Sequence, residues 1–149
     1  MTHAERDGGP PETAFSMLQR VRFGDLDAMQ HMNNVEFLRF FETARIDYVR
    51  TLVPDRAPTS RHTFGFIFAE CHISYRSPAF YDEEIRTYVW ASEVKRSSIR
   101  LEFEMRSEND DRLVAEGWGV LVGYDYEKGK AEPIPDELRA RIDIVPARA

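Results

Sequence analysis

The sequence predicts an α+β fold in which one antiparallel sheet curves around a single long helix. Two observations predict it: one long segment has a helical apolar stripe, and four segments with alternating apolar residues follow it. The links between these four segments are short, and short links favour antiparallel hairpins because parallel crossovers need about a dozen residues or more. With 149 residues, the chain fits one domain.

The N-terminal region divides into a tail and a first strand. Gly, Pro and charged residues dominate the beginning and cannot build a core, so residues 1–15 are expected to form a flexible tail and residues 16–149 the folded domain. Apolar residues alternate over residues 17–23, which predicts a strand that ends at Gly24. Residues 25–32 are then expected to form a loop.

Residues 33–52 have the pattern of a long amphipathic helix. Asn33 or Asn34 is a suitable N-cap, and Pro54 and Pro58 stop the helix at its far end. Apolar residues recur at spacings of three and four: Phe37, Phe41, Ala44, Tyr48 and Leu52. So wide an apolar face indicates a helix that packs on a broad surface, here the concave side of the sheet.

Four more strands are expected over residues 64–76, 84–91, 98–106 and 113–126, which gives a five-stranded sheet. Strict alternation in residues 64–76 would place Phe66 and Phe68 on the same face as Glu70, His72 and Ser74. In residues 98–106 the apolar face is Ile99, Leu101, Phe103 and Met105. A last helix is expected over residues 135–142, with proline near its start.

Composition argues against several classes of function. The net charge of −6 lacks the basic footprint of a nucleic-acid-binding protein. The apolar runs are far below the roughly 20 residues of a membrane span, and the N-terminus does not resemble a secretory signal. The single cysteine, Cys71, excludes an internal disulfide. We therefore expect a cytoplasmic protein with no nucleic-acid or membrane partner.

The residues with chemical potential gather just before the long helix. Asp27, His31, Asn33 and Asn34 lie within eight residues. A helix N-terminus offers free N–H groups and a positive dipole end, which would polarise a thioester carbonyl and stabilise an oxyanion. A nearby carboxylate would then attack that carbonyl or deprotonate a water. Acyl transfer to water needs only these two parts and no metal.

This stretch resembles the 4-hydroxybenzoyl-CoA thioesterase family of hotdog proteins. The family pattern, an aromatic residue, D-x-D, His, two Asn and a helix ending in E-x-A-R, is matched by Phe23, Asp25, Asp27, His31, Met32, Asn33, Asn34, Glu42, Ala44 and Arg45. The resemblance implies a single hotdog domain with Asp27 as catalytic carboxylate and an amide at or near Asn34 that polarises the carbonyl. It also implies that Lys95, Arg96, Ser97 and Ser98 form a basic turn that contacts CoA phosphates. The implied assembly is a homodimer or homotetramer with sites at the subunit interface.

Other residues of the motif have simpler interpretations. Asp25 is expected to be structural, His31 to position Asp27 or the substrate, and Asn33 and Asn34 to cap the helix as well as form the site. The family usually has Gly where this chain has Gln30, and Gly tolerates positive φ and close approach of a ligand. No metal ligands and no cofactor are expected, since CoA is part of the substrate.

Three functions remain open from the sequence. The first is hydrolysis of an acyl-CoA or acyl-carrier-protein thioester, with Asp27 as nucleophile or general base. The second is hydration or dehydration of an enoyl thioester, which also pairs an acidic residue with a histidine. The third is noncatalytic binding of acyl thioesters. Asp27 favours hydrolysis, because a pure binder has no need of a carboxylate beside the scissile carbonyl.

Overall fold

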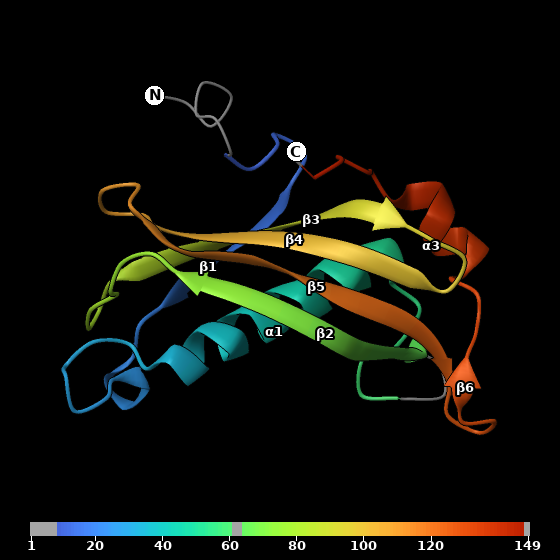
Figure 1. Cartoon of the computed structure of the whole chain (residues 1–149), viewed down its shortest axis with the longest axis horizontal. Helices are drawn as coiled ribbons and strands as arrows, with labels where there is room; N and C mark the ends of the chain where they lie inside the picture. Colours follow the sequence, from blue (N-terminus) through green and yellow to red (C-terminus); the bar gives the residue numbers. More distant parts are fainter. Residues whose placement is uncertain (1–8, 61–63, 148–149) are drawn as a thin grey trace.

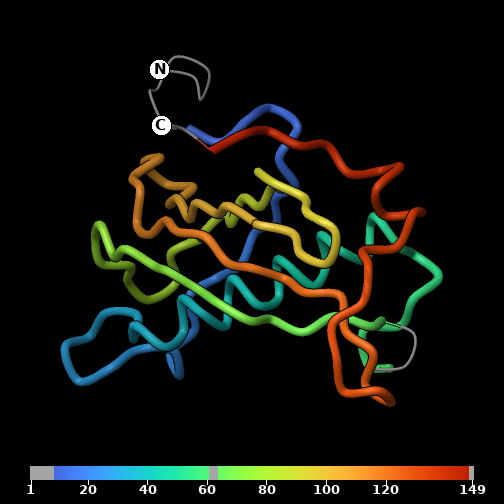
Figure 2. Tube along the Cα trace, turned by 45° about the vertical axis from the view of Figure 1, so that its right-hand side comes forward, coloured from blue at the N-terminus to red at the C-terminus, as the bar shows by residue number. Residues whose placement is uncertain are grey.

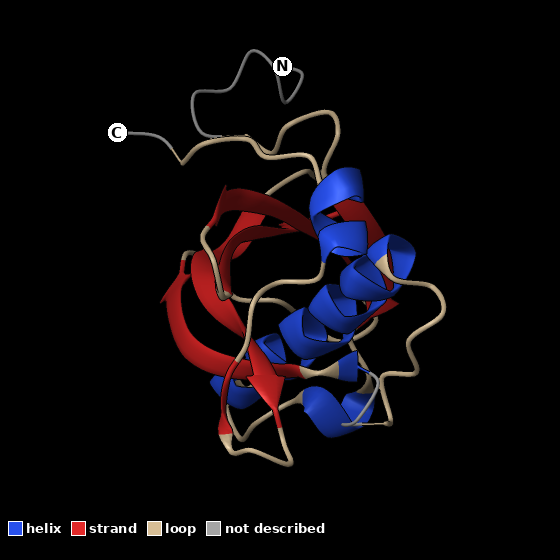
Figure 3. Ribbon diagram, turned by 90° about the vertical axis from the view of Figure 1, so that its right-hand side faces the viewer, coloured by secondary structure: helices blue, strands red, loops and turns tan. Residues whose placement is uncertain are grey.

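The computed structural model of the chain describes residues 9–60 and 64–147. One long helix lies in the concave face of a curved sheet, and a short second helix packs near the end of the chain (Figures 1 and 3). The strands are β1 (Phe15–Arg20), β2 (Phe66–Tyr75), β3 (Glu84–Val94), β4 (Ser98–Ser107), β5 (Leu113–Asp125) and β6 (Lys130–Ala131). The helices are α1 (Asn34–Leu52) and α3 (Asp136–Arg141), with a 3-10 turn at Phe23–Asp25.

The strands form one antiparallel sheet in the order β1-β3-β4-β5-β2, with β6 paired to β5. The α+β class and the wrapped helix are confirmed. The expected count of five strands is wrong by one, because the two residues of β6 are too few to show any periodicity. Among the described residues, no helix is long and apolar enough to cross a membrane.

The core lies between α1 and the sheet. Phe41 of the helix stacks on Phe103 of β4, with ring centroids 4.0 Å apart, and meets Phe68 of β2 edge to face at 5.8 Å. Gly117 and Gly119 of β5 permit this packing, because a Cβ at either position would collide with the ring of Phe103 or of Phe68. The expected apolar face of β4 is confirmed, since all four of its residues are at most 1% exposed.

The alternation expected for β2 is wrong at its first half. The β2–β5 register shifts between Phe68 and Glu70, so Ala69 forms a β-bulge. Phe66 and Phe68 consequently face the helix and the core, whereas Glu70 and His72 face outward. A single extra residue reverses the facing of everything that precedes it, and periodicity alone does not reveal it.

The ends of the chain pack more closely than expected for a tail. Strand β1 begins at Phe15, and Gly9 and Pro10 are buried. Prolines fit this role because they pack without donating a hydrogen bond. A flexible tail is expected over residues 1–15. Residues 1–8 of it lie outside the described part of the chain. Helix α1 begins one residue after its N-cap, Asn33, as expected.

Candidate active site

Asp27 lies in a tight turn, residues 26–32, that we call the Asp27 turn. The Asp27 carbonyl accepts a hydrogen bond from the N–H of Gln30 at 3.0 Å, and the Asp27 N–H donates to the carbonyl of His31 at 3.0 Å. Leu26 and Met32 form a β-bridge that closes the base of the turn. The turn therefore presents the Asp27 side chain from a hydrogen-bonded frame that connects β1 to α1.

Gln30 holds the left-handed conformation that this turn requires, with φ +65°. A tight turn followed by a left-handed residue is a common hairpin solution, and Gly is favoured at the left-handed position because it has no Cβ. The Gly that the family usually has here is thus explained by backbone geometry. This chain has Gln30 in place of the usual Gly and still adopts the left-handed backbone conformation.

The Asp27 carboxylate is held on one side and open on the other. Its Oδ1 accepts the N–H of Met29 at 2.8 Å, whereas Oδ2 lies 4.0 Å from Nδ1 of His31, beyond a hydrogen bond. The Asp27 and His31 side chains are 30% and 37% exposed. Oδ2 is therefore accessible to water or a ligand, and His31 lies beside it without a hydrogen bond to it.

The N-terminus of α1 follows directly. Oδ1 of Asn33 accepts the N–H of Val35 at 3.0 Å, which confirms Asn33 as the N-cap. Asn34 is exposed, and its carbonyl accepts a hydrogen bond from the Tyr75 hydroxyl at 3.1 Å. The positive end of the helix dipole and the first-turn N–H groups thus begin within a few residues of Asp27.

Asp25, just before the Asp27 turn, connects Arg22 to the start of α1. It is 3% exposed and accepts hydrogen bonds from the backbone N–H and the guanidinium of Arg22 at 2.8–3.1 Å. The Asp25 carbonyl accepts the N–H of Asn33 at 2.9 Å. Burial raises the pKa of the Asp25 carboxyl, but the hydrogen bonds and charge of Arg22 outweigh it and lower the pKa below its ordinary value. The position suits the structural role expected for Asp25.

The basic turn, residues 95–98, lies at the other end of the sheet (Figure 1). Arg20, which precedes the Asp27 turn, pairs with Glu84 at the start of β3, whereas Lys95 follows Val94 at its end. At about 3.3 Å per residue, the eleven residues of β3 separate the two regions by roughly 30 Å. One chain therefore does not bring Lys95, Arg96, Ser97 and Ser98 to Asp27.

The charged side chains of the basic turn are exposed, whereas its backbone is fixed by hydrogen bonds. Lys95 is 70% exposed, with Nζ 3.7 Å from a Glu93 carboxylate oxygen. Arg139 of α3 donates to the carbonyls of Lys95 and Arg96. The carbonyl of Ser97 accepts the N–H of Gly123 at 2.9 Å. These contacts place two cations at a solvent-facing corner.

A cavity of about 530 Å³ lies elsewhere, on the outer face of the sheet, and contains neither Asp27 nor His31. Its walls include Trp90 and Trp118 and both terminal segments, residues 9–12 and 145–147, which run side by side in Figure 2. Its charges are largely paired, as in Arg100 with Glu102 at 2.9 Å and Arg76 with Glu116 at 3.0 Å. Nothing in it brings an acid or base to the helix N-terminus.

Three neighbours of the site were missed by sequence reasoning. Glu36 contacts the Asp25 carboxyl and has a buried carboxylate oxygen, Tyr75 contacts the first residue of α1, and Arg112 fixes a neighbouring loop. Only Glu36 had a local signal, because it stands three residues after an N-cap Asn. In the part of the chain that the structure describes, no group of three or more His, Cys, Asp or Glu is arranged to hold a metal.

Comparison with known proteins identifies the family of the chain. The model of the thioesterase-like superfamily matches residues 21–142, most of the chain and all of the Asp27 region. The chain belongs to this superfamily. This confirms the family and the enzyme class expected from the sequence: the chain is a thioesterase-type hydrolase with the hotdog fold.

Individual relatives cover nearly the whole domain. The chain is 27% identical to the long-chain acyl-CoA thioesterase FadM of Escherichia coli, over 83% of this chain and 93% of that one. It is 28% identical to the acyl-CoA thioesterase YbgC of Haemophilus influenzae, over 87% and 94%. A thioesterase from Thermus thermophilus, solved in complex with coenzyme A and Zn, is 30% identical over 87% of this chain and 96% of that one, with a TM-score of 0.74.

Proposed function

We propose that the protein hydrolyses acyl-CoA thioesters to a free acid and CoA, with Asp27 as the catalytic carboxylate. The observation that carries the proposal is the open oxygen of Asp27 beside the N-terminus of α1. Relatives named as acyl-CoA thioesterases and one structure that contains CoA support CoA as the thiol carrier. An acyl-carrier protein remains the alternative carrier, and a cytoplasmic location belongs to the same proposal.

The chemistry needs only the groups already described. In one route the Asp27 carboxylate attacks the thioester carbon, the C–S bond breaks, the thiolate leaves, and water hydrolyses the resulting anhydride. In the other, Asp27 takes a proton from a water as the water oxygen attacks the same carbon, and the thiol leaves. Both routes develop negative charge on the carbonyl oxygen, which first-turn N–H groups and the Asn34 amide would stabilise.

The assembly we propose is a dimer formed through the edge strand β2. This strand is paired on one side only, to β5, and its free edge is ten residues long. Ile67 and Tyr75 on it are 38% and 41% exposed, and Cys71 is also exposed. A long apolar edge of this kind invites pairing with another strand.

Arg45 supports a partner at this edge. Its guanidinium lies under β2, 3.8 Å from the centre of the Phe68 ring, and its side chain is only 10% exposed. Its Nε has no hydrogen-bond partner among the described residues, and burial lowers its pKa below the ordinary value. A buried unpaired donor is costly, and an acceptor from a second subunit would remove the cost.

Two-fold pairing of β2 with its copy would also complete the site. Tyr75, at one end of β2, contacts the start of α1, whereas Phe66, at the other end, pairs with Gly123 beside the basic turn. Antiparallel pairing of two such strands sets the Tyr75 end of each against the Phe66 end of the other. The Asp27 turn of one subunit would then lie near the basic turn of its partner, so one CoA would contact both.

A substrate panel tests the function directly. Purified protein is incubated with short-chain, long-chain and aromatic acyl-CoA and with the matching acyl-carrier-protein thioesters, and free thiol is measured. We expect release from at least one acyl-CoA, and the chain preference identifies the acyl pocket. Hydration of an enoyl-CoA without thiol release would replace the proposal with the hydratase alternative.

A further inference from the structure

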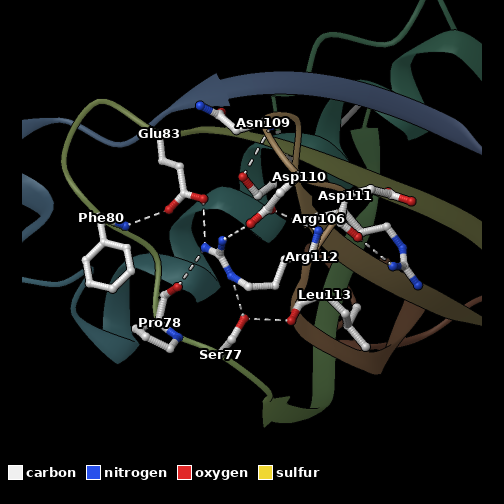
Figure 4. Close-up of polar contacts among 11 residues, drawn as sticks. Ser77, Pro78, Phe80, Glu83, Arg106, Asn109, Asp110, Asp111, Arg112 and Leu113 are labelled. Atoms are coloured by element: carbon white, nitrogen blue, oxygen red, sulfur yellow. Dashed lines mark hydrogen bonds and ion pairs between the residues drawn. The ribbon is translucent and has the colours of Figure 1, made fainter.

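Arg112, between β4 and β5, joins three separate segments. Its guanidinium donates to Oγ of Ser77 at 3.1 Å, to the carbonyl of Pro78 at 3.0 Å and to carboxylate oxygens of Glu83 and Asp110 at 2.7 Å each (Figure 4). All three guanidinium nitrogens are used. This is the branched, planar geometry that arginine provides and lysine does not.

The partners of Arg112 lie at both ends of the β2–β3 loop, residues 76–83. Ser77 and Pro78 stand at its beginning and Glu83 at its end, and the other Glu83 carboxylate oxygen accepts the N–H of Phe80 at 2.9 Å. Glu83 is 10% exposed, so its charge is largely removed from water and depends on this partner. Arg112 therefore closes the loop as a polar clamp.

The β2–β3 loop in turn holds the Asp27 turn. The carbonyl of Ala79 accepts the N–H of Met32 at 2.7 Å, directly after His31. The carbonyl of Glu83 accepts the N–H of Val21 at 2.8 Å, and the Val21 carbonyl accepts the N–H of Asp82 at 2.9 Å. The segment that carries Asp27 is thus fastened to this loop on both sides, at residues 21 and 32.

Aromatic contacts extend the same connection. Tyr81 of the loop meets Phe23, just before the D-x-D pair, edge to face with centroids 6.1 Å apart. Both rings are more than half exposed, so their contact does little to bury apolar surface. The loop is therefore held by the buried Ala79 side chain and by polar contacts, and the polar contacts converge on Arg112.

We propose that Arg112 is a positioning residue for the hydrolysis, acting on Asp27 through the β2–β3 loop. The inference rests on the proposed function for its kinetic consequence, but its structural claim is independent of it. Arg112 touches no part of the Asp27 turn itself. Its effect is to fix Ala79 and Glu83, whose carbonyls set the place where the Asp27 segment runs.

The test compares Arg112→Gln with Arg86→Gln. Arg86 is a matched control, because it is 29% exposed against 31% for Arg112 and binds the Glu108 carboxylate at 3.1–3.2 Å, with no contact to the β2–β3 loop. We expect Arg112→Gln to lower kcat about 10-fold or more with KM little changed, since small misplacement of a catalytic group is expensive. Arg86→Gln should leave kcat within about two-fold. Equal losses in both variants would overturn the inference.

Hydrogen–deuterium exchange provides a readout that does not depend on activity. Peptides covering residues 21–33 should exchange faster in Arg112→Gln than in Arg86→Gln, because the Val21 and Met32 amides lose a fixed acceptor. Unchanged exchange there would overturn the proposal even if kcat fell. If the wild type hydrolysed no thioester, the proposed function would fail, and exchange would still decide the role of Arg112.

A double variant separates positioning from general destabilisation. Glu83→Gln/Arg112→Gln removes both charges, so no buried carboxylate is left unpaired. We expect it to recover part of the stability lost in Arg112→Gln but not the kcat, because neutral side chains cannot rebuild the four-way contact. Arg112→Lys keeps the positive charge at this position, but we expect it not to restore kcat, because lysine cannot make the four contacts of Arg112. Recovery of kcat in step with thermal stability would show that Arg112 supports only the fold.

Discussion

The two ends of the sheet are built in opposite ways. At one end, the Asp27 turn is fixed by hydrogen bonds within its own backbone and to the β2–β3 loop, and the buried Asp25 accepts the N–H of Asn33 directly after the turn. At the other end, the basic turn has a fixed backbone, but its Lys95 side chain extends into solvent. The difference fits the two tasks that we propose: a reacting carboxylate must be placed accurately, whereas phosphate attraction needs only charge that can adapt.

Replacing Asp27 tests the fixed Asp27 turn and should have the largest effect on turnover. Asp27→Asn can still accept the Met29 N–H, so the turn should persist while the charge is lost. We expect kcat to fall about 100-fold or more, in line with the loss of a general base or nucleophile. Steady-state kinetics on the best acyl-CoA measures it. Near-wild-type turnover would remove Asp27 from the mechanism.

The same variant offers a control and a mechanistic probe. Calorimetry should show CoA bound as tightly by Asp27→Asn as by the wild type, because the basic turn is untouched. In the wild type, unlabelled oxygen in the acid from a single turnover in ¹⁸O-water would identify Asp27 as a nucleophile whose anhydride is opened at the Asp27 carbon. Solvent oxygen in the acid fits either a general base or water attack on the acyl carbon of the anhydride, and trapping an acyl-enzyme by rapid quench distinguishes these two.

Separating the subunits of the proposed dimer should disable the Asp27 turn and the basic turn together. Ile67→Lys/Ala69→Lys places charge on the exposed half of the β2 edge, and lysines on an edge oppose strand pairing. Sedimentation should shift from dimer to monomer, and hydrolysis of acyl-CoA should fall at least about 10-fold, because the misplacement of a binding group costs that much or more. A monomeric variant with full activity would show that one chain suffices, and a monomeric wild type would contradict the dimer.

Changing the basic turn should have a smaller effect, on substrate binding and not on turnover. Lys95→Ala/Arg96→Ala should raise KM for acyl-CoA several-fold with kcat little changed, the signature of lost uniform binding. The contacts are exposed, so added salt should reduce the difference between wild type and variant. An acyl-pantetheine thioester, which lacks the nucleotide, should show almost no change. Equal KM losses for both substrates would make the turn structural.

Sequence reasoning predicted the elements better than their details. The helical stripe, its Asn33 cap and the alternation in β4 depend on local spacing, and all are confirmed. The predicted facing of Phe66 and Phe68 is wrong, because the bulge at Ala69 arises from pairing with a strand about fifty residues away. Helix α3 is confirmed, shortened by one residue at each end.

For the site, the sequence predicts what is contiguous and misses what folding assembles. Asp27, His31, Asn33 and Asn34 stand out because they share one short stretch. Tyr75 reaches the same region from the end of β2, and Arg112 reaches it from the turn between β4 and β5; neither has a neighbouring motif to mark it. The separation of the Asp27 turn from the basic turn is equally hidden, because it depends on the strand order and on the length of β3.

The smallest expected effect concerns the strain within the Asp27 turn. Gln30 has φ +65°, and a left-handed conformation costs a residue with a Cβ about 1–2 kcal/mol. Gln30→Gly relieves that cost but loses roughly 0.5–1 kcal/mol through the greater freedom of Gly in the unfolded chain. We therefore expect a net gain of at most about 1.5 kcal/mol, or at most about 3–6 °C in Tm for a domain of this size. Met29→Gly is the matched control and should only destabilise, because Met29 is not left-handed. A lower Tm for Gln30→Gly would mean that the Gln30 side chain stabilises the turn by more than its backbone strain costs.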